Sequence, residues 1–126
     1  MGYTRFWART QKPITQKCVD EINLLMDKCV MHGITICGPD GYDEPIISAD
    51  CIAFNGCGEK DLEYEAFVIN NEYNKVDFCK TATKPYDYAV REALNILSKY
   101  DIVNGVRADR PYDEIVSDAE YIRDHN

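Results

Sequence analysis

The sequence predicts an α+β fold, in which a mostly antiparallel sheet of about five to six strands is packed by two to three helices. Short alternating or apolar segments follow one another between residues 34 and 79, as the strands of a meander do. Longer segments repeat apolar residues every three or four positions, as amphipathic helices do. At 126 residues the chain has room for one core, so residues 1–126 are expected to form a single domain.

The first two elements predicted are a strand over residues 3–10 and a helix over residues 15–32. Thr15 is a suitable N-cap because its hydroxyl can accept a bond from a free backbone N–H. Gly33 can adopt the left-handed conformation that ends many helices. The alternation of the strand predicts one face of Tyr3, Arg5, Trp7 and Arg9 and an opposite face of Thr4, Phe6, Ala8 and Thr10.

The middle of the chain predicts a succession of strands joined by turns. Glycine, proline and aspartate at residues 38–41 predict a turn, and Asn55-Gly56-Cys57-Gly58 predicts a hairpin. Residues 45–47 are a further candidate for extended structure. The strands are expected at residues 34–37, 52–54, 62–69 and 75–79.

The last third of the chain predicts a helix, a strand and a helix. The second helix is expected to begin near Pro85, capped by Thr83 or Lys84, because proline suits a first helical turn. Residues 103–108 predict a strand. A third helix is expected from Pro111, with acidic residues in its first turn. The predicted order is therefore β-α-β-β-β-β-α-β-α.

Charge and composition exclude several classes of protein. The net charge is −8, and residues 20–126 hold all 22 acidic residues against ten of the 14 basic ones. Such a body repels duplex nucleic acid and membranes over most of its surface. The chain has neither a signal-peptide core nor an apolar segment of about 20 residues that could span a bilayer. We therefore expect a cytosolic protein whose six cysteines are thiols.

No residue pattern identifies a catalytic, metal or cofactor site. No cysteines are spaced CxxC, and no glycine-rich phosphate loop opens a helix. Acidic residues gather at residues 40–44, but without the spacing of a calcium loop. The two histidines stand at the predicted end of the first helix and next to the last residue, so neither is placed as a central base. We assign no catalytic residue, no metal and no cofactor.

The strongest candidate site combines cations and aromatic rings from two segments. One is the first strand, and the other is the connection from residue 79 into the second helix, where free N–H groups suit an anion. Aromatic rings and guanidinium planes can stack a nucleobase. If the segments are neighbours, they predict a ligand-binding site of Tyr3, Arg5, Trp7, Arg9, Lys80, Thr81, Lys84, Tyr86 and Asp87. The alternative is that the rings cover a helix while the cations pair with acidic residues.

The chain resembles a family of small proteins of phages, prophages and related mobile DNA. The resemblance spans residues 2–87, and its first motif often has His and Tyr where this chain has Arg5 and Phe6. The matching segments are Gly2-Tyr3-Thr4-Arg5-Phe6-Trp7, Gly38-Pro39-Asp40-Gly41, Glu44-Pro45-Ile46-Ile47, Phe54-Asn55-Gly56, Phe78-Cys79-Lys80-Thr81-Ala82 and Lys84-Pro85-Tyr86-Asp87. The resemblance implies a viral accessory protein in the host cytosol, and proteins of this kind often blunt host defence.

Three functions follow as hypotheses. The first is binding and sequestration of a small phosphorylated or nucleotide-like ligand at the predicted site. The second is an acidic inhibitor of a host defence protein, acting through Asp113, Glu114, Asp118 and Glu120 of the third helix. The third is a small enzyme that uses Cys79 as nucleophile, or Lys80, Tyr86 and Asp87 as acid–base groups. A sheet face bearing Tyr3 and Trp7 would equally serve as an interface between two copies of the chain.

Overall fold

The computed structural model describes residues 2–126 and confirms the α+β fold and the predicted order of elements. Six strands form two three-stranded antiparallel sheets, accompanied by three α-helices and a short 3₁₀ helix. The elements are β1 (Thr4–Arg9), α1 (Gln16–Met31), β2 (Ile46–Ile47), β3 (Ile52–Phe54), η1 (Gly58–Lys60), β4 (Phe67–Ile69), β5 (Val76–Lys80), α2 (Asp87–Lys99), β6 (Val103–Ala108) and α3 (Asp118–Asp124).

The first sheet has the strand order β5-β1-β6, and we call it the β1 sheet. Phe6 of the central strand lies opposite Phe78 of β5 and Arg107 of β6. The register with β6 shifts between Phe6 and Ala8, where an irregularity includes Gly105 at a positive φ of 61°. Glycine suits this position because it lacks the Cβ that disfavours the left-handed region.

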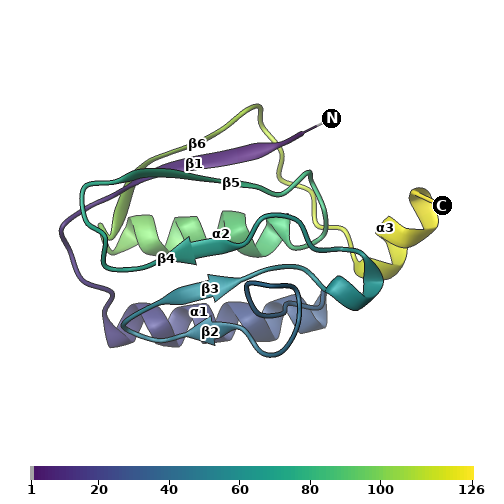
Figure 1. Cartoon of the computed structure of the whole chain (residues 1–126), viewed down its shortest axis with the longest axis horizontal. Helices are drawn as coiled ribbons and strands as arrows, with labels where there is room; N and C mark the ends of the chain where they lie inside the picture. Colours follow the sequence, from purple (N-terminus) through teal and green to yellow (C-terminus); the bar gives the residue numbers. More distant parts are fainter. Residues whose placement is uncertain (1) are drawn as a thin grey trace.

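Helices cover one side of each sheet, as Figure 1 shows. Helix α2 lies along the β1 sheet, and α1 packs beside the β2-β3-β4 sheet and against α2. Thr15 caps α1 as predicted, since its side chain accepts from the Cys18 N–H, and Gly33 follows the helix with a φ of 72°. Within residues 2–126, none of the helices combines the length and apolar character needed to cross a bilayer.

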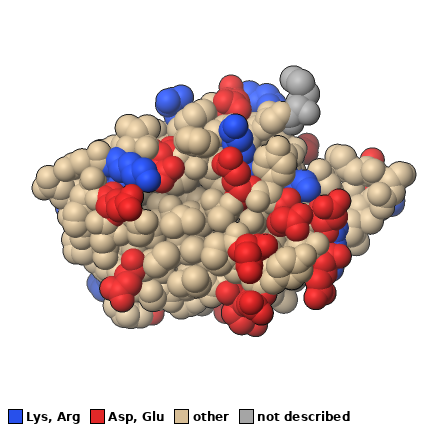
Figure 2. Space-filling view, in the orientation of Figure 1, with Lys and Arg blue, Asp and Glu red and all other residues tan. Residues whose placement is uncertain are grey.

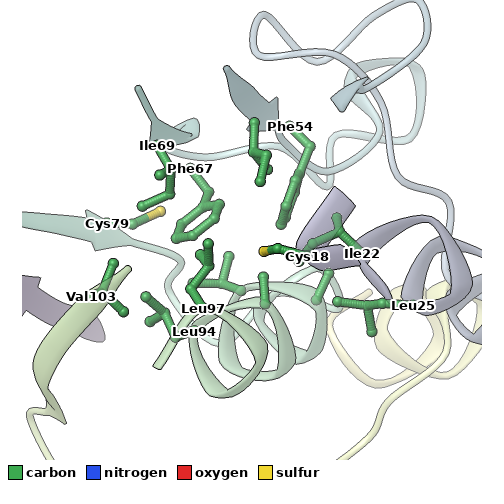
Figure 3. Close-up of a cluster of buried hydrophobic side chains, with 14 of the residues drawn as sticks. Cys18, Ile22, Leu25, Phe54, Phe67, Ile69, Cys79, Leu94, Leu97 and Val103 are labelled. Carbon is green, nitrogen blue, oxygen red and sulfur yellow. The ribbon is translucent and has the colours of Figure 1, made fainter. Parts of the chain in front are cut away.

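The core fills the space between the two sheets and helices α1 and α2. Phe67 is its centre, with its ring centroid 5.2 Å from that of Trp7 and 5.0 Å from that of Phe54. Aliphatic side chains of α2 and the thiols of Cys18 and Cys79 close around these rings. Figure 3 shows how Ile22, Leu25, Ile69, Leu94, Leu97 and Val103 converge on this cluster.

The strand predicted over residues 34–37 is wrong. Only Cys37 makes a bridge there, to Asn55, and the pairing strand is instead the extended segment at Ile46–Ile47. The turn at residues 38–41 is confirmed by a 2.9 Å bond from the Gly41 N–H to the Gly38 carbonyl.

The strand predicted over residues 62–69 is shorter, and the tight hairpin at residues 55–58 is absent. Strands β3 and β4 do pair, but a longer loop containing η1 connects them. The Asn55 side chain holds this loop by bonding both the N–H and the carbonyl of Tyr64. Gly56 is required because a Cβ there would lie 2.1 Å from the Leu62 carbonyl oxygen.

The third helix begins at Asp118 rather than Pro111, and α2 begins at Asp87 with Tyr86 as its N-cap. Residues 109–117 instead form a connection held against β1, because the Tyr3 hydroxyl donates to the Arg110 carbonyl at 2.7 Å. Ser117 then starts α3 with a complete capping box. The local sequence does not reveal this contact, because the two residues that make it are far apart in the chain.

Candidate functional site

The two segments predicted to form the site are neighbours. Strands β1 and β5 pair directly, with Thr4 opposite Lys80. The Thr81 N–H donates to the Tyr3 carbonyl at 3.0 Å, which carries the contact into the connection before α2. The juxtaposition expected from the sequence is therefore present, and the question becomes which side chains of these segments are accessible to a ligand.

The Arg5 guanidinium is directed inward and is held by Asp87. Its Nε and Nη2 donate to the two carboxylate oxygens at 2.9 and 2.8 Å, and Nη2 also donates to the Tyr112 carbonyl. The Thr81 hydroxyl donates to the same carboxylate at 2.6 Å. Burial alone would lower the pKa of Arg5, but the bonds and charge of Asp87 raise it overall. This buried pair uses its charges within the fold.

Arg9 is buried as well and binds backbone carbonyl groups. Its Nη1 donates to the carbonyls of Thr10, Lys12 and Ile102, and its Nε donates to that of Asn70. Burial lowers the pKa of Arg9 from its ordinary value. The side chain therefore holds together the loops at one end of the β1 sheet and presents no free donor group on its Nη1 side.

The predicted aromatic residues lie in the interior. Trp7 packs on Phe67, and the Tyr86 hydroxyl donates to the Glu65 carbonyl at 2.5 Å. Burial raises the pKa of Tyr86 above its ordinary value, with smaller contributions from Cys79. Tyr3 is buried as well, with its ring centroid 5.5 Å from that of Tyr112, so none of the three predicted rings is open to a ligand.

The two lysines of the predicted site lie nearer the surface. Lys80 is exposed at the end of β5, with its Nζ 6.0 Å from the centroid of the Phe78 ring. Lys84 is partly exposed, donates from Nζ to the Asp61 carbonyl at 3.0 Å, and lies 5.8 Å from the centroid of Tyr64. Contact between these lysines and a ligand stays a prediction.

The opposite face of the β1 sheet carries the accessible aromatic residues, which the sequence interpretation did not include in the site. Phe6 and Phe78 lie across from each other with ring centroids 6.4 Å apart and an interplanar angle of 45°. Phe78 is 49% exposed. The Arg107 guanidinium lies 4.4 Å from the centroid of Phe6. We call Phe6, Phe78, Lys80 and Arg107 the outer cluster.

A signal for the outer cluster exists in the sequence, but it is incomplete. Alternation places Phe6 opposite Trp7 on the first strand, and Phe78 two residues before Lys80. The pairing of Phe6 with Phe78 and Arg107 joins segments far apart in the chain. Only the strand order β5-β1-β6, which alternation does not specify, makes them one surface.

The side-chain cations of the outer cluster form no ion pair among residues 2–126, although the Glu65 carboxylate accepts from the Lys80 backbone N–H at 2.8 Å. The same residues contain eight ion pairs elsewhere. In Figure 2 the basic side chains lie mostly over the upper half, where Figure 1 places the β1 sheet. The charged side chains in view over the lower half are mostly Asp and Glu, whereas the upper half carries both signs. The positive charge in this view is therefore concentrated around the β1 sheet.

The cysteines offer neither a reactive thiol at this surface nor a metal cluster. All six are free, and burial raises the pKa of Cys79 to about 12. A thiol that stays protonated at neutral pH is a poor nucleophile. In the described part of the chain, no three His, Cys, Asp or Glu side chains come together as metal ligands would.

The residues expected to form an acidic face on the third helix do not do so. Asp113 and Glu114 precede α3, and Asp118 is buried and paired with Lys60 at 3.2 Å.

Comparison with known proteins identifies no relative of this chain. No family model, curated protein or solved structure matches it.

Proposed function

We propose that this protein binds a nucleotide-like ligand on the outer face of the β1 sheet. The observation that carries the proposal is the outer cluster, in which two partly exposed aromatic rings each lie close to a cation that forms no ion pair among residues 2–126. A nucleobase can stack on an aromatic ring, and its phosphate can bind Lys80 or Arg107. The proposal keeps the ligand class expected from the sequence and moves the site to the opposite face of β1.

Binding, rather than catalysis, is the role that this surface supports. The outer cluster contains a lysine and an arginine but no side chain positioned as an activated nucleophile. In a viral accessory protein, a surface of this kind would withdraw a nucleotide or nucleic acid from the host. The position of the cations supports this site, because the Lys and Arg side chains in view lie mostly over the β1 sheet.

A ligand screen with matched variants tests the proposal. We expect mononucleotides, cyclic dinucleotides or short oligonucleotides to raise the melting temperature, since ligand at 100 times its Kd adds about 2.7 kcal/mol to the stability. Phe78→Ser should reduce this shift. Tyr42→Ser is the control, because Tyr42 is also 49% exposed but lies in the loop before β2, outside the β1 sheet. A shift that survives both variants equally, or no shift with any nucleotide, would contradict the proposal.

An acidic interaction surface is the second candidate, and one observation favours it at a new position. The loops before β2 and around η1 pack together, with the Gly58 N–H donating to the Gly41 carbonyl at 2.7 Å. They bring Asp40, Asp43, Glu44, Glu59 and Glu63 to one region of the molecule. Such a region would suit a basic partner protein.

Charge reversal distinguishes this candidate from ligand binding. A variant with Asp40→Lys, Glu44→Lys and Glu59→Lys should lose any host protein captured from lysate at low salt, and Phe78→Ser should retain it. Capture should weaken at high salt because exposed charges are screened. A captured protein that is retained by the charge-reversal variant would exclude the acidic surface.

A further inference from the structure

We infer that the ligand of the outer cluster is a stretch of single-stranded nucleic acid with at least two unstacked bases, rather than a free mononucleotide. This inference rests on the proposed function and specifies its ligand class. It follows from the relative positions of Phe6 and Phe78, the positions of the nearby cations, and a third aromatic residue in the same depression as Lys80.

The two rings of the cluster cannot share one base. Their planes are inclined by 45° and their centroids are 6.4 Å apart, so a flat base that stacks on Phe78 is tilted away from Phe6. Two bases that remain stacked on each other are only about 3.4 Å apart, as along one strand of a duplex. Neighbouring bases must therefore separate to use both rings, and single strands can spread their bases in this way.

The two cations come from different strands, with Arg107 across from Phe6 on β6 and Lys80 two residues along β5 from Phe78. A strand whose bases lie on Phe6 and Phe78 would therefore have one cation near each base. Since Arg107 forms no ion pair within residues 2–126, its guanidinium is available for a phosphate or for stacking on the base beside Phe6.

A further aromatic residue, Tyr64, lies in the same depression as Lys80. Tyr64 is 51% exposed and has the Lys84 ammonium 5.8 Å from its ring centroid. Tyr64 and Lys80 line an open depression of about 450 Å³, together with Glu63 and Glu65. The two carboxylates would repel a phosphate, so we assign the base to Tyr64 and the phosphate to Lys84. The surface thus offers positions for up to three bases.

A duplex does not fit this arrangement. Paired bases are stacked on their neighbours, and their faces are not available to aromatic side chains. A duplex would contact the protein mainly through phosphates, and the net charge of −8 disfavours that contact. The aromatic contacts therefore select single strands, while the cations contribute a modest dependence on salt.

Fluorescence anisotropy with labelled RNA and DNA single strands of about eight nucleotides tests the inference, since sheet-type binding sites cover roughly 4–16 nucleotides. We expect both strands to bind, with competition that strengthens from mononucleotide to about three nucleotides. Phe78→Ser should weaken binding about 5- to 150-fold, the loss of one stacked base. Tyr42→Ser should leave it unchanged. Arg107→Gln should reduce the slope of log Kd against log salt by about 0.7.

Three other results would contradict the inference, and they differ in whether the proposed function survives. If a mononucleotide or a cyclic dinucleotide binds as tightly as the strand and Phe78→Ser abolishes it, the single-strand inference is wrong and the proposed function stands. If a duplex binds as tightly as the strand, base stacking is not the mode of binding and the inference is wrong. If no nucleotide of any length binds, both fail.

Discussion

The two faces of β1 use similar residue types for opposite purposes. On the inner face, Arg5 and Arg9 are buried and every contact they make is with the protein itself. On the outer face, Phe6 is near a cation that has no ion pair within residues 2–126. The presence of cationic and aromatic residues therefore does not by itself identify a binding surface. What distinguishes the outer face is that its two cations, Lys80 and Arg107, form no ion pair among residues 2–126.

This difference predicts that inner-face substitutions change stability and outer-face substitutions change binding. A buried charge requires its partner, because desolvation without compensation is costly. An exposed ring contributes little to folding, because it remains in contact with water in the native state. The following predictions test this contrast, beginning with the largest expected effect.

Asp87→Ala should destabilise the protein by about 3–5 kcal/mol, because it leaves the Arg5 guanidinium buried without its counter-charge. Urea denaturation followed by circular dichroism measures the loss. The control is the triple variant Arg5→Met, Thr81→Val and Asp87→Leu, which removes all three polar groups and should recover much of the stability. A single variant as stable as the parent would show that Arg5 is not held by this pair.

Trp7→Ala and Phe6→Ala compare adjacent residues on the two faces. Trp7→Ala should cost about 3–5 kcal/mol, because it opens a cavity against Phe67 in the core. Phe6→Ala should cost clearly less, because its ring is partly exposed and has no core neighbour of this kind. Thermal unfolding of both variants gives the comparison. Equal losses would mean that the outer face is packed as tightly as the core.

Alkaline pH should lower the free energy of unfolding through the buried thiols of the core. Burial raises the pKa of Cys18 to about 11 and those of Cys29 and Cys79 to about 12, above the ordinary value of 9.0. Between these values the unfolded state loses protons that the native state retains, so stability is present below pH 9.0 and falls as pH rises toward 12. Each thiol contributes up to about 1.4 kcal/mol per pH unit.

Urea denaturation at about pH 8 and about pH 10 under reducing conditions measures this slope. A Cys79→Ala variant serves as the comparison, because it should lose part of the pH dependence whatever its stability at the lower pH. A free energy of unfolding that is the same at both pH values would contradict the burial of these thiols.

Phe78→Ser should have the smallest effect on folding, within about 0.5 kcal/mol of the parent, although it weakens ligand binding. The reason is that half of this side chain is already in contact with solvent. Comparing its urea midpoint with its affinity for a single strand separates the two properties. A large loss of stability would place Phe78 in the core and remove the basis for the contrast.

Local features of this fold could be predicted from the sequence, and features set by distant contacts could not. Helix α1 and its Thr15 cap follow from periodicity and capping chemistry within a short segment. The two faces of β1 were also evident from alternation. Which face is buried depends on Asp87, which lies 82 residues from Arg5 in the chain. A pair of charges expected at the surface is thus internal because each satisfies the other.

The same limit explains the two ends of the chain. The connection after β6 was predicted as helix because its local pattern allows one, but contacts with Tyr3 and Arg5 hold it in another conformation. The two segments of the candidate site are neighbours, as predicted, since β1 and β5 pair, while their binding of a ligand stays a prediction. The accessible side chains were nevertheless those of the opposite face, because only strand order brings Phe6, Phe78 and Arg107 together.

The central position of β1 has a consequence for how the protein is made. This strand is synthesised before its two neighbours, yet it lies between them, and β6 is the later of the two. Until β5 and β6 have been synthesised, β1 therefore has unpaired edges, and Arg5 cannot form its ion pair until Asp87 has been synthesised. Such distant contacts slow folding. We expect the nascent chain to remain dependent on protection from aggregation until residues 103–108 have left the exit tunnel.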